Sequence, residues 1–160
     1  MYARACDVSY GVMYARACDI SYWGDACLRE GVINGDNMSD SVLREKSKEF
    51  AKKIVFTTKR IKEKDKEWVL TEQLLRSGTS IGANVHEAQY AHGRADFISK
   101  LEIALKECFE SEYWLELMFE TGYLEEKEFK LLIGECGLIR KMLVNSCKTA
   151  KENKTKPTKC

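Results

Sequence analysis

The stretch LREKSKEFAKKIVFTTKRI, residues 43–61, decides the fold because its apolar and small residues alternate between spacings of four and three. The recurring positions are Leu43, Ser47, Phe50, Ile54, Thr57 and Ile61. This spacing places those side chains on one stripe of an α-helix and leaves charged residues on the other faces. Such a helix gains its stability by packing the stripe against partner helices. The stretch therefore predicts one helix of an all-α protein.

Three further stripes with helical spacing follow along the chain. Their members are Leu70, Leu74, Ile81, Val85 and Ala88, then Phe97, Leu101, Leu105, Cys108, Leu115 and Met118, then Phe129, Leu132, Cys136, Ile139, Leu143 and Ala150. We expect the polar run KEKDKE at residues 62–67 to end the first helix. We also expect Asp65 and Asp96 to cap the next two helices, and Gly122 to end the third in a left-handed conformation. Short connections predict an antiparallel up-down-up-down four-helix bundle.

The chain of 160 residues suits a single domain, which we place at residues 38–150, followed by a basic tail at residues 151–160. Residues 1–37 show no helical pattern, and YARACDVSY at residues 2–10 recurs as YARACDISY at residues 14–22. A period of twelve residues used twice fits no solenoid repeat. We expect a poorly ordered N-terminal extension outside the fold. A duplicated DNA segment translated in frame, or a start codon assigned too early, would explain it.

Composition favours a cytoplasmic protein. No run approaches the roughly 18 apolar residues of a membrane span, and the start lacks the layout of a signal peptide. The seven cysteines are odd in number and form no Cys-x-x-Cys pair. Because Cys108, Cys136 and Cys147 occupy apolar stripe positions, we expect them to be buried thiols in a reducing compartment.

The stretch RSGTSIGANVHEA, residues 76–88, holds the residues that could carry chemistry. A Walker loop would continue with Gly-Lys-Ser/Thr, whereas Ala83 and Asn84 follow the second glycine here, and a dinucleotide loop would follow a strand. His86 and His92 are six residues apart, which turns a helix by about 600°, so one helix cannot present both rings to one metal. We predict no catalytic residues, no cofactor and no metal, and hence no enzyme.

Polar residues of this region share a stripe about 80° wide that flanks the apolar one. They are Gln73, Arg76, Ser80, Asn84 and Glu87. Two interpretations remain open: hydrogen bonds between helices or subunits, and a site for a ligand or RNA. Gly78 and Gly82, four residues apart on another face, would let a neighbouring backbone approach closely and offer a place for tight packing in an assembly.

Arg76 and Glu87 need separate partners, because about three helical turns, or 16 Å, separate them. A buried charge without a partner is strongly unfavourable. We expect Glu110 or Glu112 of the third helix to pair with Arg76, and lysines of the first helix to pair with Glu87. If Arg76 is buried, its removal should lower stability by a few kcal/mol, on the order of what such a pair is worth.

Charge is distributed unevenly along the chain although the net charge is +1. Residues 44–66 carry ten Lys/Arg against four Asp/Glu, and residues 102–135 carry ten Glu against three Lys. Either the protein has a basic face and an acidic face, or these are solvated helix surfaces. A basic face could bind phosphates, and its candidate nucleic-acid contacts are Lys52, Lys53, Lys59, Arg60 and Lys62.

Residues 74–124 closely resemble a bacterial four-helix-bundle family whose first members were open reading frames inside intervening sequences of 23S ribosomal RNA. The family pattern of Arg-Ser, then Ser-Ile, Asn-hydrophobic and Glu is met by Arg76, Ser77, Ser80, Ile81, Asn84, Val85 and Glu87. Its later pattern is met by Asp96, Phe97, Ile103, Ala104, Leu105 and Glu110. The resemblance covers about residues 39–148.

The resemblance implies an antiparallel four-helix bundle that assembles as a homopentamer around a pore and has no known enzymatic activity. Some relatives are accessory proteins of diversity-generating retroelements, which bind nucleic acid and a reverse transcriptase. We therefore expect a non-catalytic, self-assembling module associated with RNA or the ribosome. The alternative is a retroelement accessory scaffold. The motif residues with a structural or interface role would be Arg76, Ser80, Asn84, Glu87 and Glu110.

Overall fold

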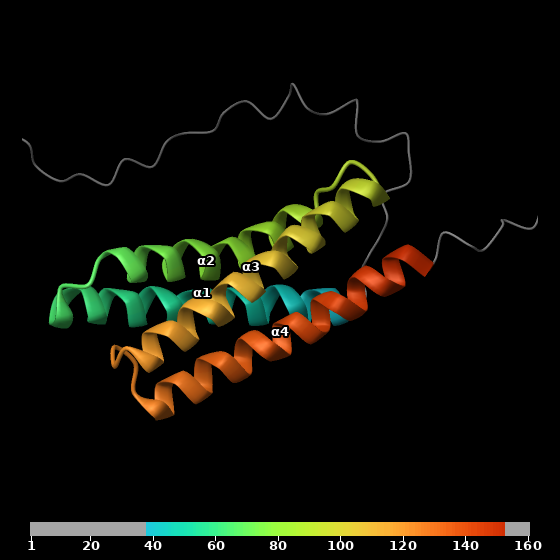
Figure 1. The fold of residues 1–160 in the computed structure, drawn as a ribbon. Helices are drawn as coiled ribbons and strands as arrows, with labels where there is room; N and C mark the ends of the chain where they lie inside the picture. The colour runs from blue at the N-terminus through green and yellow to red at the C-terminus, as the bar shows by residue number, and fades with distance from the viewer. Residues whose placement is uncertain (1–37, 153–160) are drawn as a thin grey trace, which may run out of the picture. The chain divides into compact units, whose positions relative to one another are not determined.

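The computed structural model describes residues 38–152, which form four antiparallel helices (Figure 1). Helix α1 spans Met38–Asp65, α2 spans Val69–Ala88, α3 spans Arg94–Glu120 and α4 spans Glu126–Glu152. Successive helices pack side by side and α4 returns to α1, whereas the diagonal pairs of this bundle do not contact each other. The all-α up-down-up-down bundle expected from the sequence is confirmed. The expected extension at residues 1–37 lies outside the described residues.

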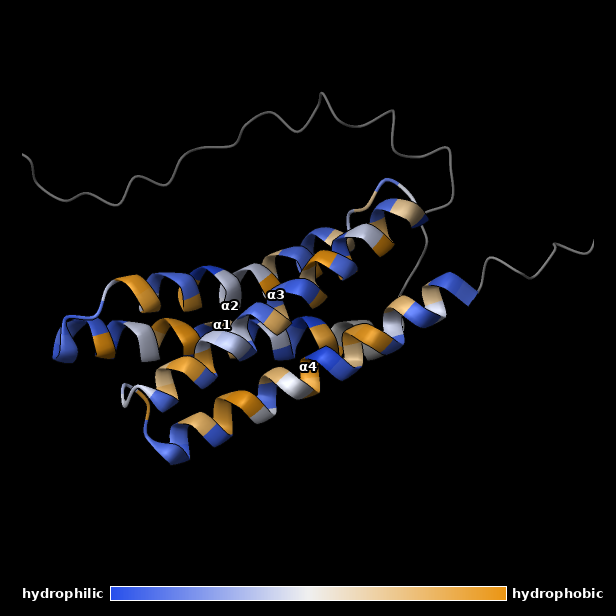
Figure 2. Ribbon diagram, in the orientation of Figure 1, coloured by the Kyte–Doolittle hydropathy of each residue, from blue (hydrophilic) through white to orange (hydrophobic). Residues whose placement is uncertain are grey.

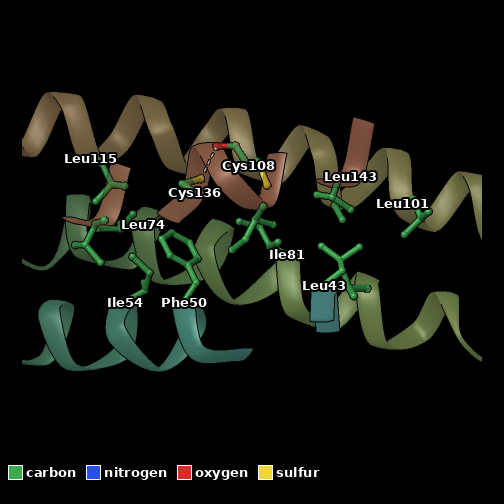
Figure 3. Close-up of a cluster of buried hydrophobic side chains, with 14 of the residues drawn as sticks. Leu43, Phe50, Ile54, Leu74, Ile81, Leu101, Cys108, Leu115, Cys136 and Leu143 are labelled. Atoms are coloured by element: carbon green, nitrogen blue, oxygen red, sulfur yellow. Dashed lines mark hydrogen bonds between the residues drawn. The ribbon is translucent and has the colours of Figure 1, made fainter. Parts of the chain in front are cut away.

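All four helices contribute their apolar stripes to one core (Figures 2 and 3). Its fully buried side chains include Phe50, Ile54, Leu74, Ile81, Leu115, Leu132 and Leu143. Cys108, Cys136 and Cys147 are buried free thiols, as expected, and the Cys136 thiol donates a hydrogen bond to the carbonyl oxygen of Cys108 at 3.5 Å. Contact with the Cys136 thiol, together with burial, raises the pKa of Cys108, which keeps that thiol protonated.

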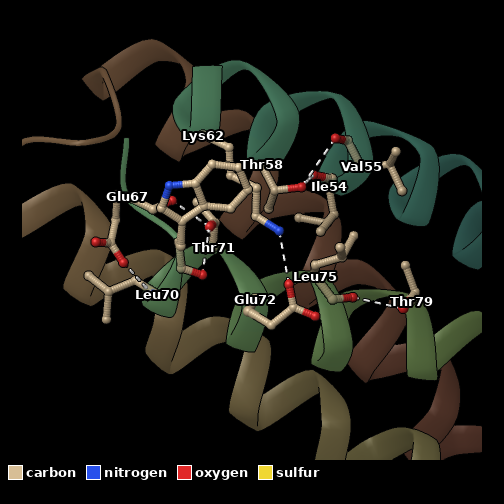
Figure 4. Close-up of polar contacts among 11 residues, drawn as sticks. Ile54, Val55, Thr58, Lys62, Glu67, Leu70, Thr71, Glu72, Leu75 and Thr79 are labelled. Atoms are coloured by element: carbon tan, nitrogen blue, oxygen red, sulfur yellow. Dashed lines mark hydrogen bonds and ion pairs between the residues drawn. The ribbon is translucent and has the colours of Figure 1, made fainter. Parts of the chain in front are cut away.

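The connection between α1 and α2 differs from the expected one. Helix α1 ends at Asp65, within the polar run that we expected to end it. Asp65 is the last residue of α1, however, and does not cap α2, whose N-cap residue is Trp68. Lys66 then turns the chain with φ 56°, in the left-handed region. The carboxylate of Glu67 accepts a hydrogen bond from the backbone N–H of Leu70 at 2.5 Å and so supplies the cap that Asp65 does not (Figure 4).

Asp96 is not the cap of α3 that we expected, because the N-cap residue is Gly93 and no side chain makes the capping hydrogen bond. Asp96 lies in the first turn, where its carboxylate accepts a hydrogen bond from the backbone N–H of His92 at 3.1 Å. At the other end Gly122 has φ 83°, which confirms the predicted left-handed stop. The carbonyl oxygen of Met118 accepts hydrogen bonds from the N–H groups of Tyr123 and Leu124, which closes the turn into α4.

Gly78 and Gly82 let α2 approach α1 of the same chain. A Cβ atom on Gly78 would lie 2.9 Å from Cγ1 of the fully buried Ile54. A Cβ atom on Gly82 would lie 3.5 Å from the carbonyl oxygen of Ser47, an ordinary contact distance. The close-packing position is therefore filled within the bundle, and an assembly of several chains must use other surfaces.

The first prediction compares these two glycines. Alanine at either position gains roughly 1 kcal/mol of helix propensity. In Gly78→Ala the new methyl group overlaps Ile54, and overpacking of a core costs about 1–3 kcal/mol. We expect Gly78→Ala to lower the free energy of unfolding and Gly82→Ala to leave it unchanged or raise it, measured by urea denaturation followed by circular dichroism. Equal stability of the two variants would contradict close packing at Gly78.

Candidate functional site

The polar stripe of α2 faces α3. Arg76 Nη2 lies 2.5 Å from Glu110 Oε1, one of the two carboxylates that the sequence suggested. Glu87 Oε2 lies 2.5 Å from Lys100 Nζ, so its partner belongs to α3 and not to α1 as we expected. The hydrogen bond to Glu87 raises the pKa of Lys100, which keeps this lysine charged.

Other polar side chains in and beside the stripe form hydrogen bonds within their own helix. Asn84 Nδ2 donates to the backbone oxygen of Ser80 at 2.9 Å, and Trp114 Nε1 donates to Glu110 Oε1 at 3.3 Å. The Arg76 side chain is 59% exposed. A large effect of Arg76 on stability was expected only if this residue were buried, and it is not. An exposed ion pair contributes about 0–1 kcal/mol. The fold therefore depends little on Arg76, which remains accessible at the surface.

A buried hydroxyl pair lies beside this stripe. Ser111 Oγ donates to Ser77 Oγ at 3.0 Å, and both residues are fully buried. Ser77 belongs to the quoted motif, but sequence reasoning missed Ser111. Ser111 could have been identified from its position between Cys108 and Leu115, where the helical spacing predicts a core residue.

Glu107 is the least satisfied charged group at the α2–α3 contact. Its Oε2 atom is buried and has no hydrogen-bond partner within residues 38–152. Burial, followed by repulsion from Glu110, raises the pKa of Glu107 above its ordinary value of 4.5, while Arg76 partly opposes the shift. A carboxyl group with a raised folded-state pKa favours the fold when protonated and loses that contribution as pH rises through its folded-state pKa.

The second prediction follows from the raised pKa of Glu107. Glu107→Gln should be more stable than the natural chain at pH 7, because the natural carboxyl group is then ionised and poorly solvated. The difference should shrink as the pH falls through the raised folded-state pKa of Glu107, and it should be gone below the ordinary value of 4.5. Urea denaturation between pH 4 and pH 8 measures it. Glu116→Gln, on the exposed face of α3, is the matched control and should show no such trend.

The two histidines line one shallow depression of about 390 Å³ at the α2–α3 connection, together with Tyr90 and Lys100. Because α2 ends at Ala88, His92 lies in the loop, and the single-helix geometry considered for the sequence does not apply. Residues 38–152 contain no group of three or more histidine, cysteine or carboxylate side chains placed to hold a metal ion.

The basic residues of α1 divide into two sets. Three candidates form ion pairs with other helices: Lys53 with Glu135, Arg60 with Glu128, and Lys62 with Glu72. Lys52 has no ion-pair partner among the side chains described, and Lys59 is 3.9 Å from Glu63 of its own helix. With Lys48, which is also exposed, these two lysines fall within about 40° of each other on the outer side of α1. We name Lys48, Lys52 and Lys59 the lysine line.

An apolar surface flanks the α1–α4 contact, and sequence reasoning missed it. Phe56 is 71% exposed and Leu131 is 53% exposed. The ion pairs of Lys53 and Arg60 with α4 set the register, and they place these two residues at the same level of the contact. Val42 and Leu138 are exposed on the same flanks, at multiples of seven residues from them. We name Val42, Phe56, Leu131 and Leu138 the α1–α4 apolar face.

The four helices place the protein in the class of antiparallel four-helix bundles. Its motif residues lie along the contact between α2 and α3. Residues 39–145 match the 23S rRNA-intervening sequence protein family, and the chain belongs to it, which confirms the resemblance. The chain is also similar to a crystal structure of a protein of unknown function from the S23 ribosomal protein family of Bacteroides thetaiotaomicron. The identity is 48% and the TM-score 0.68, over 69% of this chain and 99% of the other.

No curated protein matches the chain. Among the described helices, none is long and apolar enough to cross a membrane.

Proposed function

We propose that the protein is a non-catalytic module that assembles with copies of itself and associates with RNA. The observation that carries the RNA association is the lysine line. Its three members are exposed and take no part in the ion pairs that join α1 to α2 and α4. Lys48 and Lys59 are eleven residues apart, which is about 16 Å along the helix. A lysine ammonium group near a phosphate releases condensed counterions, which favours binding.

The overall charge of the bundle sets the expected strength of this association. Residues 38–152 contain 20 Lys/Arg and 20 Asp/Glu, so no long-range positive field draws RNA to the protein. Binding then depends on the local contacts of about three lysines. For single-stranded RNA this corresponds to a slope of about −2 in the logarithm of affinity against the logarithm of salt concentration.

The third prediction concerns the lysine line. The double variant Lys52→Gln/Lys59→Gln should bind a single-stranded RNA oligonucleotide more weakly and show a shallower salt slope, by about 1.4. The control Lys130→Gln/Lys148→Gln makes the same charge change on α4. Fluorescence anisotropy at two salt concentrations measures both. Equal losses in the two double variants, or binding by the natural chain that is indifferent to salt, would refute the proposal.

Self-assembly is supported by the α1–α4 apolar face. Large apolar side chains at heptad spacing on two adjacent helices form a surface onto which a further helix can pack. Exposing them to water is unfavourable, and burial against another chain removes that contact with water. A second copy of the chain is the partner we propose, and the family resemblance implies a pentamer as the stoichiometry.

The fourth prediction tests this face. Phe56→Asp/Leu131→Asp should reduce the mass measured by light scattering on the full chain to that of one chain, with the helical content unchanged. Tyr90→Asp is the control, because Tyr90 is 72% exposed on the α2–α3 connection, outside the face. A natural chain that already has the mass of one chain at micromolar concentration would refute self-assembly.

The second candidate function is an accessory scaffold of a diversity-generating retroelement, and the same apolar face is the feature that favours it. In that case a reverse transcriptase, and not a second copy, would cover the face. A reverse-transcriptase gene beside this one supports the scaffold, whereas a position within a ribosomal RNA operon supports the first proposal.

A further inference from the structure

A shallow depression of about 280 Å³ lies where the end of α1 meets the start of α2. Its accessible lining is largely apolar, and the residues around it include Val55, Lys59, Lys62, Glu63, Trp68 and Leu75. Figure 4 labels Val55, Lys62 and Leu75 among them. Trp68 is 60% exposed, which is unusual for the largest apolar side chain. We name this depression the Trp68 pocket.

The indole of Trp68 is held from one side. Lys62 Nζ lies 5.6 Å from the centroid of the ring, a cation–π distance. Lys62 is itself fixed by Glu72, whose Oε2 atom lies 2.9 Å from Nζ (Figure 4). Lys62 lies over one face of the indole, and the 60% exposure of the residue leaves ring surface accessible to a flat ligand.

The backbone that carries Trp68 is fixed as well. The Thr71 hydroxyl donates to the carbonyl oxygen of Glu67 at 2.6 Å, and Trp68 O lies 3.1 Å from the same hydroxyl (Figure 4). The carboxylate of Glu67 in turn caps α2 through the N–H of Leu70. A side chain on a backbone held in this way loses little conformational entropy on binding, which favours affinity.

The lysines beside the pocket favour nucleic acid as its occupant. Lys59 belongs both to the lysine line and to the lining of the Trp68 pocket, so the line leads directly into the pocket. Proteins that bind single strands combine basic groups along the backbone with aromatic rings on which bases stack. An apolar side chain of another protein would pack against the indole, but it would bring no negative charge to the lysine line.

We propose that the Trp68 pocket binds one unpaired nucleobase of single-stranded RNA, stacked on the accessible ring surface of the indole. Lys48, Lys52 and Lys59 contact the phosphates that lead to it. This inference rests on the proposed association with RNA and adds how the RNA is bound. Every base has a flat π-face, so the site tolerates different sequences. Paired bases are already stacked, so the site selects single strands over duplexes.

Glu63 is the group beside the pocket that opposes RNA. It lies 3.9 Å from Lys59 and partly neutralises that lysine. Glu63→Gln therefore raises the affinity for RNA if the pocket receives a nucleotide. For an uncharged apolar side chain the same substitution changes little.

The fifth prediction tests the pocket in the full chain with Trp68→Ala and Trp68→Phe. The probe is a fluorescein-labelled oligouridine, and a labelled RNA duplex of the same length is the comparison. We expect Trp68→Ala to weaken oligouridine binding about tenfold, Trp68→Phe to keep most of it, and duplex binding to stay unchanged. Val69→Ala is the matched control, because Val69 is 70% exposed next to Trp68 and does not line the pocket.

The outcomes separate this inference from the proposal beneath it. If the lysine variants lose RNA and Trp68→Ala does not, RNA association stands and base stacking is overturned. If the natural chain binds neither probe, the proposed function fails and the inference fails with it. If Trp68→Ala leaves RNA binding intact but lowers the mass in light scattering, the pocket holds a side chain of another copy, which also overturns base stacking.

Discussion

The contact between Gly78 and Ile54 fixes the direction in which every other face of α2 points. Because Gly78 has no side chain, the branched side chain of Ile54 lies against the backbone of α2. The polar stripe lies about 180° around α2 from Gly78 and Gly82. It must therefore face away from α1 and toward α3. This is why Arg76 pairs with Glu110 and Glu87 pairs with Lys100.

The sequence predicted most of the fold, because helix stripes and stops are local properties. Gly122 ends α3 in a conformation that only glycine adopts freely, so this role can be predicted from the sequence alone. Asp65 was misjudged because lysine and glutamate favour helix formation, so α1 includes residue 65 before the chain turns at Lys66. The partner of Glu87 was also misjudged, because the sequence does not show that Gly78 and Gly82 face α1 and that Glu87 therefore points away from α1.

The candidate sites were harder to predict, because exposure depends on which neighbours a helix has. Phe56 and Leu131 fall outside the apolar stripes of their helices and are exposed, but the sequence does not show that they flank the same contact between α1 and α4. Counting lysines likewise overstated the basic surface, since Lys53 and Arg60 are paired with carboxylates of α4. The relative from Bacteroides thetaiotaomicron is itself of unknown function, so the function has to be argued from these surfaces.

The arrangement of surfaces around α1 would link the proposed assembly to the proposed RNA binding. The lysine line lies about 60° around the helix from Phe56, and Val55 of the Trp68 pocket lies about 40° to its other side. The lysine line and the α1–α4 apolar face therefore point in different directions from α1. Under the proposed function, three lysines and one aromatic ring would give weak binding in a single chain. An assembly that joins several such sites raises the effective concentration of each for the next stretch of the same RNA, which strengthens overall binding by about 10²–10⁴ without any new contact. Under the proposed function, a bundle with balanced net charge would thus hold RNA firmly as an assembly, while each chain would bind it only weakly.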